Sequence, residues 1–272
     1  MKVLFSEFAP DYGQYRYPYV VWGCLEPGEM PADLYGAGFH PACPNLERFT
    51  LCRHLRVPLP GWRPSSENRR ILRKGAGLEV ELVPRSAFQY SDAHRQRWLA
   101  FADERFGPGI MGPARLDGLM AGRVVSHVLV CRDMGDAGRE VGAVLLYVEP
   151  GRMAHYYYAF YDLRHPIRSL GMYLMTKAVA EFQAAGFGHL YLGTCYSKKA
   201  LYKLQFDGLE FFNGLTWTTD LDQLRFLVER DPQSGHLLED PGFLDRVGGV
   251  AGVMGGGRFR LQFATNSSPT VH

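Results

Sequence analysis

The pattern of hydrophobic and polar positions changes in character near residue 65. Before it, aromatic, proline and glycine residues occur without a sustained period, and only residues 19–24 predict a short strand. After it, segments with helix or strand periodicity follow one another closely. We expect helices at about 65–74, 91–106, 171–185, 198–204 and 220–229, and strands at 78–83, 124–132, 140–149, 155–161, 189–193 and 211–219.

The order of these elements predicts a mixed sheet. The β-branched segments 124–132 and 140–149 flank the turn-like sequence MGDAG and form a hairpin. The helix at 171–185 stands between the strands 155–161 and 189–193, as in a strand–helix–strand crossover. Antiparallel hairpins combined with one crossover are typical of an α+β (α/β) domain, with a mixed sheet flanked by helices.

Composition divides the chain into three parts. We expect an irregular N-terminal subdomain at 1–64, a catalytic domain at 65–232 and a Gly-rich, partly mobile tail at 233–272. No stretch of about 18 uncharged apolar residues predicts a membrane span. Glu7 and Asp11 interrupt any signal-peptide core. The five cysteines are too few and too scattered for a disulfide framework, which favours a reducing, cytoplasmic location.

Charge is informative only locally. The net charge of the whole chain is +2, which by itself indicates no nucleic-acid partner. Residues 53–74, however, contain seven Lys and Arg residues against a single acid, Glu67. Such a segment attracts a polyanion such as an RNA backbone, or it is simply a solvated basic surface.

A second candidate site lies where the strand at 155–161 leads into the following helix. Tyr161 and Asp162 are followed by the sequence Arg168-Ser169-Leu170-Gly171. A loop that opens a helix in this way presents unpaired backbone N–H groups at the positive end of the helix dipole, where anions bind. In acetyltransferases of this topology the equivalent loop holds the pyrophosphate of coenzyme A. A second small residue usually follows the glycine there, whereas this chain has Tyr173. The alternative is a tight helix start without a ligand.

Several sequence blocks resemble those of the arginyl/leucyl-tRNA–protein transferases, and they occur in family order over roughly residues 15–215. The blocks are Phe39-His40-Pro41-Ala42-Cys43-Pro44, Cys52-Arg53-x-Leu55-Arg56-Val57-Pro58, Ser65 with Arg69-Arg70, Tyr161-Asp162 with Arg168-Ser169-Leu170-Gly171-x-Tyr173, and Tyr191-Leu192-Gly193 with Lys199-x-x-Tyr202-Lys203 and Leu209-Glu210. The chain departs from the family at Ser66, Glu67 and Gly208, and it lacks the family's Cys-x-x-Cys cluster.

The resemblance implies an acetyltransferase-like (GNAT-type) fold and aminoacyl transfer. The donor is an aminoacyl-tRNA, with arginine as the expected amino acid, and the acceptor is a protein or peptide with a free N-terminus. The amine attacks an ester that is already activated, so positioning, proton removal and oxyanion stabilisation suffice.

The resemblance also assigns roles to particular residues. The catalytic candidates are Tyr202, Lys199, Asp162 and Glu210. The candidates that bind the tRNA 3′ end are Arg168, Ser169, Leu170, Gly171 and Lys203, and those that bind the acceptor or RNA are Arg53, Arg56, Arg69 and Arg70. No cofactor and no metal are expected, and Cys24, Cys43 and Cys52 are not expected to form a metal or iron–sulfur site.

Three alternatives stay open at this point. The same donor can serve a small-molecule acceptor, the fold can be that of a coenzyme A-dependent N-acetyltransferase, or the chain can be an RNA-binding module without turnover. Tyr173 argues against coenzyme A, whereas the basic segment 53–74 fits either RNA hypothesis.

Overall fold

The computed structural model describes residues 1–230 and 235–256. The chain divides into two compact units, Met1–Glu229 and Arg230–His272. In the second unit the described residues form a 3₁₀ helix, η3 (Leu237–Glu239), and two helices, α7 (Pro241–Val247) and α8 (Gly249–Gly256). The tail at 233–272 was expected to be partly mobile. Its residues from 257 onward lie outside the described ranges.

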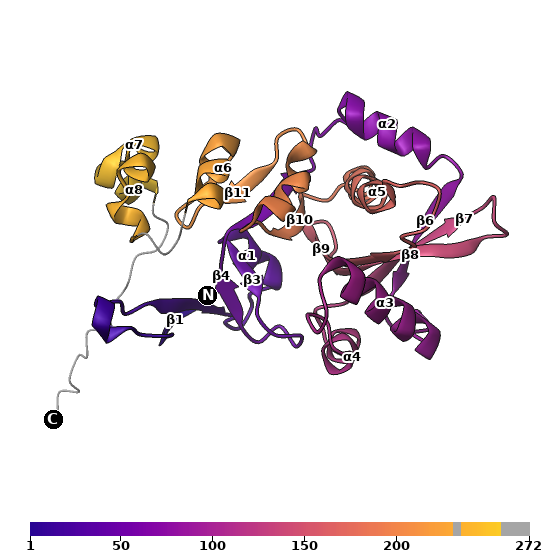
Figure 1. Ribbon diagram of the computed structural model, residues 1–272, viewed down its shortest axis with the longest axis horizontal. Coiled ribbons are helices and arrows are strands. Elements are labelled where there is room, and N and C mark those ends of the chain that lie inside the picture. The colour runs from indigo at the N-terminus through magenta and orange to yellow at the C-terminus, as the bar shows by residue number, and fades with distance from the viewer. Residues whose placement is uncertain (231–234, 257–272) are drawn as a thin grey trace. The chain divides into compact units, whose positions relative to one another are not determined.

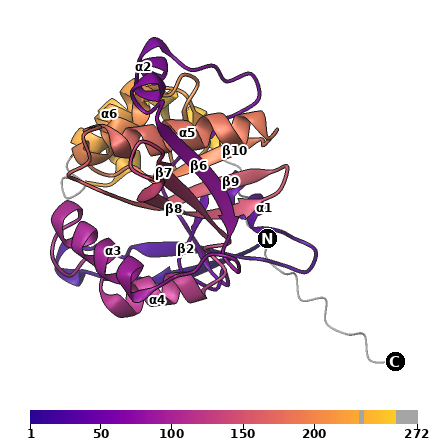
Figure 2. The same cartoon turned by 90° about the vertical axis from the view of Figure 1, so that its right-hand side faces the viewer.

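The first unit is built on an eight-stranded mixed sheet (Figures 1 and 2). Its strands, in spatial order, are β12 (Trp217–Thr218), β11 (Glu210–Phe212), β5 (His54–Pro58), β10 (His189–Thr194), β9 (Met153–Tyr161), β8 (Arg139–Glu149), β7 (His127–Asp133) and β6 (Leu78–Pro84). Neighbouring strands are antiparallel except β9 and β10, which are parallel and joined through a helix. The expected mixed sheet with one crossover is therefore confirmed.

Helices cover both faces of this sheet, as predicted. The crossover helix α5 (Leu170–Ala184) packs on β9 from one face, and α2 (Ser66–Lys74) lies against α5. The helices α3 (Asp92–Arg105) and α4 (Pro113–Ala121) lie on the opposite face (Figure 2). Ser65 and Ser91 begin α2 and α3 by accepting backbone N–H groups with their hydroxyls, which explains why these two boundaries were readable from the sequence. The helix α4 was not predicted.

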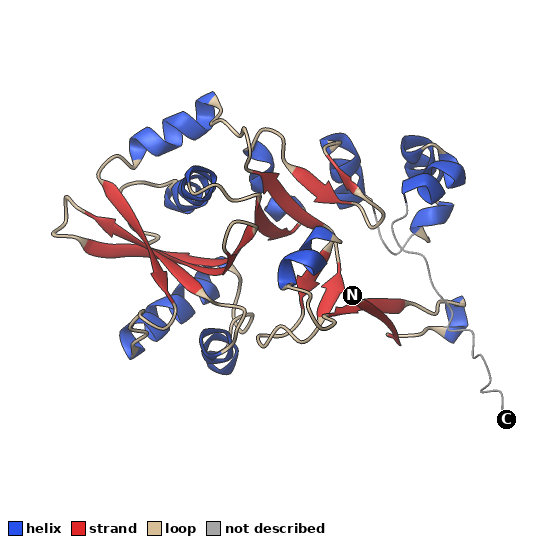
Figure 3. Ribbon diagram, turned by 180° about the vertical axis from the view of Figure 1, so that it is seen from behind, coloured by secondary structure: helices blue, strands red, loops and turns tan. Residues whose placement is uncertain are grey.

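The N-terminal segment is more regular than expected. It forms a four-stranded antiparallel sheet in the order β1 (Lys2–Glu7), β2 (Tyr19–Cys24), β4 (Phe49–Leu51) and β3 (Phe39–Pro41), together with helix α1 (Pro31–Gly36) and the 3₁₀ helix η1 (Tyr12–Gln14). Figure 3 shows both sheets in red. The strand predicted at 19–24 is confirmed as β2. The strands β1, β3 and β4 were not predicted, because they are short, lack clear periodicity and depend on pairing with distant segments.

The small sheet is continuous with the interior of the first unit. Leu34, Tyr35 and Phe39 are fully buried in the same hydrophobic cluster as residues of β7 and β8. The strand β5, which lies before residue 64, belongs to the large sheet. The expected boundary at residue 64 therefore does not coincide with an edge of that sheet.

The remaining elements complete the first unit. They are the 3₁₀ helix η2 (Lys198–Gln205) and the helix α6 (Leu221–Glu229). The segment 198–204 was predicted as a short helix, and it forms the 3₁₀ helix η2. None of the helices in the described ranges combines the length and the apolar character needed to cross a bilayer.

Candidate functional site

The two parallel strands of the large sheet separate shortly after they meet. They pair only at His189–Met153, Leu190–Ala154 and Tyr191–His155, although both strands continue further. At this point β9 has a bulge, because Leu145 and Leu146 on β8 pair with Tyr158 and Tyr156 and leave Tyr157 unpaired. Bulges redirect side chains and often lie beside functional sites. The structure therefore opens the sheet beyond His155, at the centre of the fold.

Lys203 of η2 reaches this opening. Its ammonium donates a hydrogen bond to the carbonyl of Thr194 at 3.2 Å and lies beside Gly193, whose φ of 81° fits only glycine well. Burial lowers the pKa of Lys203 to about 8, an effect that nearby Cys195 partly opposes. An amine with such a pKa exchanges protons readily near neutral pH.

Three histidines lie close to this lysine. His40 comes from β3, His54 from β5 and His155 from β9, and the charge of Lys203 acts on all three. Burial lowers the pKa of His40 to about 4 and takes the pKa values of His54 and His155 well below their ordinary range. All three imidazoles are therefore neutral at physiological pH. Together with Lys203 they form a group that we call the His–Lys cluster.

The β9–α5 loop (residues 162–169) lies at the other end of β9. His165 is buried and pairs with Asp133 of β7 at 3.0 Å, so it anchors the loop rather than facing a ligand. Arg168 is exposed, and within the described part of the chain its side chain has no hydrogen-bond or ion-pair partner. The hydroxyl of Ser169, the N-cap of α5, is buried without a partner. The first turn of α5 thus keeps uncapped N–H groups next to a free cation.

Two aromatic residues explain the local sequence around this helix start. The ring of Tyr161 occupies the space where a side chain at Gly171 would lie, because a Cβ there would be 2.6 Å from the Tyr161 hydroxyl. Tyr173, which departs from the coenzyme A pattern, points into the interior and donates a hydrogen bond to the Leu78 carbonyl at 3.1 Å. Its ring fills the space beside Gly75, so the departure serves the packing of α5 on α2.

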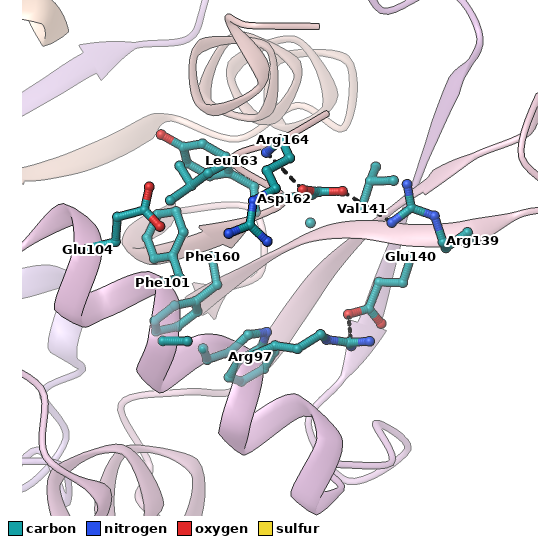
Figure 4. A pocket seen from close by; sticks show the side chains of 14 residues that line it. Arg97, Phe101, Glu104, Arg139, Glu140, Val141, Phe160, Asp162, Leu163 and Arg164 are labelled. Atoms are coloured by element: carbon teal, nitrogen blue, oxygen red, sulfur yellow. Dashed lines mark hydrogen bonds and ion pairs between the residues drawn. The ribbon is translucent and has the colours of Figure 1, made fainter. Parts of the chain in front are cut away.

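A cavity of about 390 Å³ adjoins the loop on the α3 side of the sheet (Figure 4). Its lining alternates aromatic rings with charged groups that are mostly paired. Asp162 accepts hydrogen bonds from Arg139 at 3.2 Å and from the backbone N–H of Arg164 at 2.9 Å. Arg97 likewise pairs with Glu140 at 3.0 Å. The Arg139–Asp162 pair holds the start of the loop against β8, and the Arg97–Glu140 pair holds α3 against β8.

The predicted catalytic residues do not converge on one point. Asp162 lines the cavity, whereas Glu210 of β11 forms an ion pair with Arg56 at 2.6 Å. Lys199 is exposed on η2 and has no ion-pair or hydrogen-bond partner among the described residues. Tyr202 is 52% exposed, and its partial burial, with a smaller effect of nearby Tyr161, raises its pKa. Asp162 and Tyr202 therefore lie near Tyr161 and the loop, and Glu210 belongs to another part of the sheet.

The predicted basic group likewise separates into two places. Arg53 and Arg56 are half-buried on β5 or just before it, where they stack on Tyr196 and Trp217 at 4.8 Å and 3.9 Å. Arg53 also donates hydrogen bonds to the carbonyls of Cys195 and Leu227. These two arginines connect parts of the fold. Arg69 and Arg70 are exposed on α2, where Arg69 bonds to the Pro64 carbonyl and Arg70 to Glu67.

Sequence reasoning missed the histidines and gave Lys203 a different role. No two members of the His–Lys cluster lie within ten residues of each other, so no motif announces them. The usable signal was the glycine before Thr194, which marks a strand that bends where a backbone or ligand approaches closely.

Comparison with known proteins identifies relatives over most of the chain. No family model matches it. An aspartate/glutamate leucyltransferase of Pseudomonas paraeruginosa is 29% identical over 208 residues, covering 71% of this chain and 86% of the relative. One of Thiobacillus denitrificans is 30% identical over 179 residues, covering 64% of this chain and 72% of the relative.

Solved structures also show partial similarity. L-PGS from Bacillus licheniformis superimposes with a TM-score of 0.39 at 13% identity and covers 61% of this chain and 51% of its own. FemX superimposes with a TM-score of 0.40 at 10% identity and covers 60% and 59%. The sequence relatives at 29–30% identity have the same name and align with most of their length. The chain therefore belongs to the aspartate/glutamate leucyltransferase family and is an aminoacyltransferase.

Proposed function

We propose that the protein transfers a leucyl group from leucyl-tRNA to the N-terminal amine of a protein or peptide that begins with Asp or Glu. The names of the relatives support the leucyl group and the acidic acceptor. The resemblance found in the sequence supports tRNA as the carrier, although it favoured arginine as the amino acid. The structural observation that carries the proposal is the opening between β9 and β10, with the half-buried Lys203 beside it.

The β9–α5 loop is the proposed contact for the donor. The 3′ end of tRNA is polyanionic, and the first turn of α5 offers uncapped N–H groups at the positive end of a 15-residue helix. Arg168 is exposed beside these groups, so its guanidinium can bind a phosphate without breaking an existing ion pair in the described structure. The bulge at Tyr157 and the separation of the strands leave the backbone between them available to the aminoacyl ester.

Lys203 is the proposed proton carrier. An N-terminal amine has a pKa of about 7.7–8.0, close to the value of about 8 to which burial lowers the pKa of Lys203. The acceptor nitrogen forms a bond to the ester carbonyl carbon while the bond to the ribose oxygen breaks. The proton lost by the amine passes to Nζ of neutral Lys203 and from there to the leaving ribose oxygen, so the lysine returns to its initial state.

Arg115 is the proposed partner of the acidic acceptor side chain. It lies in the first turn of α4, and its guanidinium donates hydrogen bonds to the Tyr158 hydroxyl at 3.1 Å and the Ile110 carbonyl at 3.4 Å. Tyr158 directly follows the bulge, and Arg115 acts electrostatically on Tyr157 there. Two bonds hold the guanidinium in place and leave further N–H groups for a carboxylate.

A transfer assay tests the proposal. The purified protein is mixed with leucyl- or arginyl-tRNA, or with acetyl-coenzyme A, and with peptides that differ only in an N-terminal Asp, Glu, Asn, Gln or Ala. Mass spectrometry then identifies both donor and acceptor. We expect leucine to be added to the Asp and Glu peptides. Arginine addition would replace the proposed donor with the one expected from the sequence, and acetylation alone would contradict aminoacyl transfer.

The proposed role of Arg115 predicts a change in specificity. Arg115→Gln should reduce the preference for Asp over Asn peptides by at least tenfold in kcat/KM, because one charge-assisted hydrogen bond is worth about 1.5–3 kcal/mol. Transfer to the Asn peptide should change little. Arg73→Gln, which removes an exposed arginine of α2, is the control. An unchanged Asp-to-Asn ratio in Arg115→Gln would assign acceptor recognition elsewhere.

A further inference from the structure

The histidines of the His–Lys cluster meet although they belong to three strands of two sheets. Each ring offers one nitrogen, and these three nitrogens lie within 4.8 Å of one another. The ring of His40 is 5.0 Å from the rings of His54 and His155, and the latter two are 5.4 Å apart. The three ring planes are nearly perpendicular to one another, at 81–86°. Their lone pairs can therefore point at a common centre, which stacked rings could not do.

Hydrogen bonding does not account for this arrangement. Nδ1 of His40 and Nε2 of His155 are buried and have no partner. Neither ring nitrogen of His54 makes a hydrogen bond of normal geometry, although the backbone of Phe39 lies close enough to influence its pKa. A buried polar atom without a partner costs about 1–3 kcal/mol, and such atoms often mark an ion or water. Three adjacent rings in this state indicate a shared ligand.

We propose that His40, His54 and His155 bind a divalent transition-metal ion, with Zn²⁺ as the best match. Three imidazole nitrogens are a common ligand set for zinc, whereas Mg²⁺ and Ca²⁺ require oxygen ligands. At a Zn–N distance of about 2.1 Å, tetrahedral ligand atoms lie about 3.4 Å apart. The ligand nitrogens must therefore approach one another by up to about 1.4 Å from their mutual distances of up to 4.8 Å.

One ligand already has the outer partner that metal sites use. Nδ1 of His155 is hydrogen-bonded to the hydroxyl of Tyr35 at 2.8 Å, which leaves Nε2 directed to the cluster. Such a bond fixes the tautomer and the orientation of a metal-binding imidazole. Tyr35 is fully buried on α1 and packs against His54 at 5.7 Å as well. The ion would thus connect β3 of the small sheet with β5 and β9 of the large sheet and stabilise the folded state.

The charge of Lys203 predicts the direction in which the metal affinity changes when this lysine is replaced. Its positive charge reaches all three histidines, so it opposes a second cation among them. Lys203→Met should therefore bind the metal more tightly than the natural protein. An ordered water is the alternative occupant of a polar interior site. If water occupied this site, replacing Lys203 would produce no such increase in the affinity for a divalent metal.

Metal binding can be measured without any transfer reaction, so the result is independent of the proposed function. The full-length protein is stripped with a chelator and titrated with Zn²⁺ against a chromophoric competitor, and with Co²⁺ by visible absorption. We expect one equivalent of zinc with a dissociation constant below micromolar. We also expect Co²⁺ ligand-field bands typical of four-coordination without a thiolate charge-transfer band.

Four variants locate the ion. His54→Gln and His155→Gln should each weaken zinc binding at least 100-fold, and Tyr35→Phe should weaken it by about 10–100-fold. His189→Gln, a histidine of β10 outside the group, is the control and should bind as the natural protein does. If the cluster variants fail to fold, the cobalt spectrum of the natural protein decides. Absence of stoichiometric metal, unchanged affinity in His155→Gln, or weaker binding in Lys203→Met would each overturn the site.

A thiolate site is the remaining competitor. Cys52 is the cysteine nearest in sequence to His54, and burial raises the pKa of its thiol to about 12, which disfavours the metal-binding thiolate. Among residues 1–230 and 235–256, the group close enough to hold a metal contains histidines and no cysteine. Cys52→Ala should keep full zinc affinity, and loss of binding in this variant would overturn the histidine assignment.

Discussion

The β9–α5 loop and the His–Lys cluster lie along the same strand, yet they are constructed in opposite ways. The loop is one continuous segment whose charges face solvent or are paired, with Arg168 exposed and Asp162 bonded to Arg139. The cluster draws its members from four elements; His54 and His155 are fully buried, and His40 and Lys203 are half-buried. Burial holds three imidazoles neutral and lowers the pKa of Lys203 to about 8.

This difference indicates that the loop and the cluster have different functions. Exposed groups lose little water when they bind an anion, so the loop is suited to binding and release. Desolvated groups change protonation state or ligate ions more readily, and their lowered pKa values make the stability of the folded state depend on pH. Substitutions in the loop should therefore alter donor binding, whereas substitutions in the cluster should alter the chemical step and the stability.

The strongest test of this division is Lys203→Arg. Arginine keeps the positive charge but remains protonated at any accessible pH, so it cannot accept the proton of the acceptor amine. We expect kcat to fall by about 10²–10⁴, the usual contribution of general acid–base catalysis, with little change in the KM for the donor. Lys198→Arg, the same change at an exposed lysine of η2, should leave kcat within about twofold. Equal losses in both variants would show that Lys203 is not the proton carrier.

Acid should destabilise the protein through the cluster. A histidine whose folded pKa is depressed stays neutral while the unfolded chain binds a proton, so stability is complete above about pH 6.5 and falls as the pH decreases. For His40 the loss runs from 6.5 to about 4 and reaches about 3 kcal/mol. Urea unfolding of the chelated protein between pH 7 and 4 measures it. His40→Gln should show a shallower decline, and identical slopes would contradict this origin.

The loop was readable from the sequence because its parts are consecutive. Arg168 and Gly171 stand at the start of an amphipathic helix, and local sequence determines both the helix and its dipole. The crossover around α5 followed from the same periodicity, and it fixed the parallel pair β9–β10. These features depend on neighbours within a few residues, so they could be predicted from a single amino-acid sequence.

The cluster was not readable because tertiary pairing creates it. His40 and His54 become neighbours only when β3 joins the small sheet and β5 inserts between β10 and β11. Neither strand has a periodic signal, and β5 lies in a segment that was expected to be irregular. For Glu210 the sequence suggested a role that its position does not share with the other candidates. Its family block suggested catalysis, whereas the register of β11 with β5 places it against Arg56. Burial and long-range register decided both outcomes.

Packing at the start of α5 can be tested separately from binding. In Gly171→Ala the new Cβ would lie 2.6–2.8 Å from three atoms of Tyr161, so the ring must move, at a cost of about 1–3 kcal/mol. Gly118→Ala in α4 is the matched control, because a Cβ there meets no atom within 4 Å. It should stabilise the helix by about 0.5–1 kcal/mol. Denaturant unfolding distinguishes the two, and equal stabilities would show that Tyr161 yields easily.

The smallest expected effect isolates the loop as a binding element. Arg168→Ala removes a side chain that has no partner within the described structure, so the unfolding free energy should stay within about 0.5 kcal/mol. The KM for the charged tRNA should rise about tenfold with kcat preserved. The reason is that the lost phosphate contact stabilises the bound donor and the transition state equally. The salt dependence of donor binding should also weaken by about one released counterion.

Arg225→Ala, which removes an exposed arginine that is paired with Asp222 on α6, provides the comparison. It should change neither the KM for the donor nor the salt slope. If Arg168→Ala instead lowered kcat and left KM unchanged, the loop would act in the chemical step, and the division between a binding loop and a reactive cluster would fail. Removal of an exposed side chain without partners should hardly change the free energy of unfolding. A loss of more than 1 kcal/mol in Arg168→Ala would therefore show that Arg168 has a structural role.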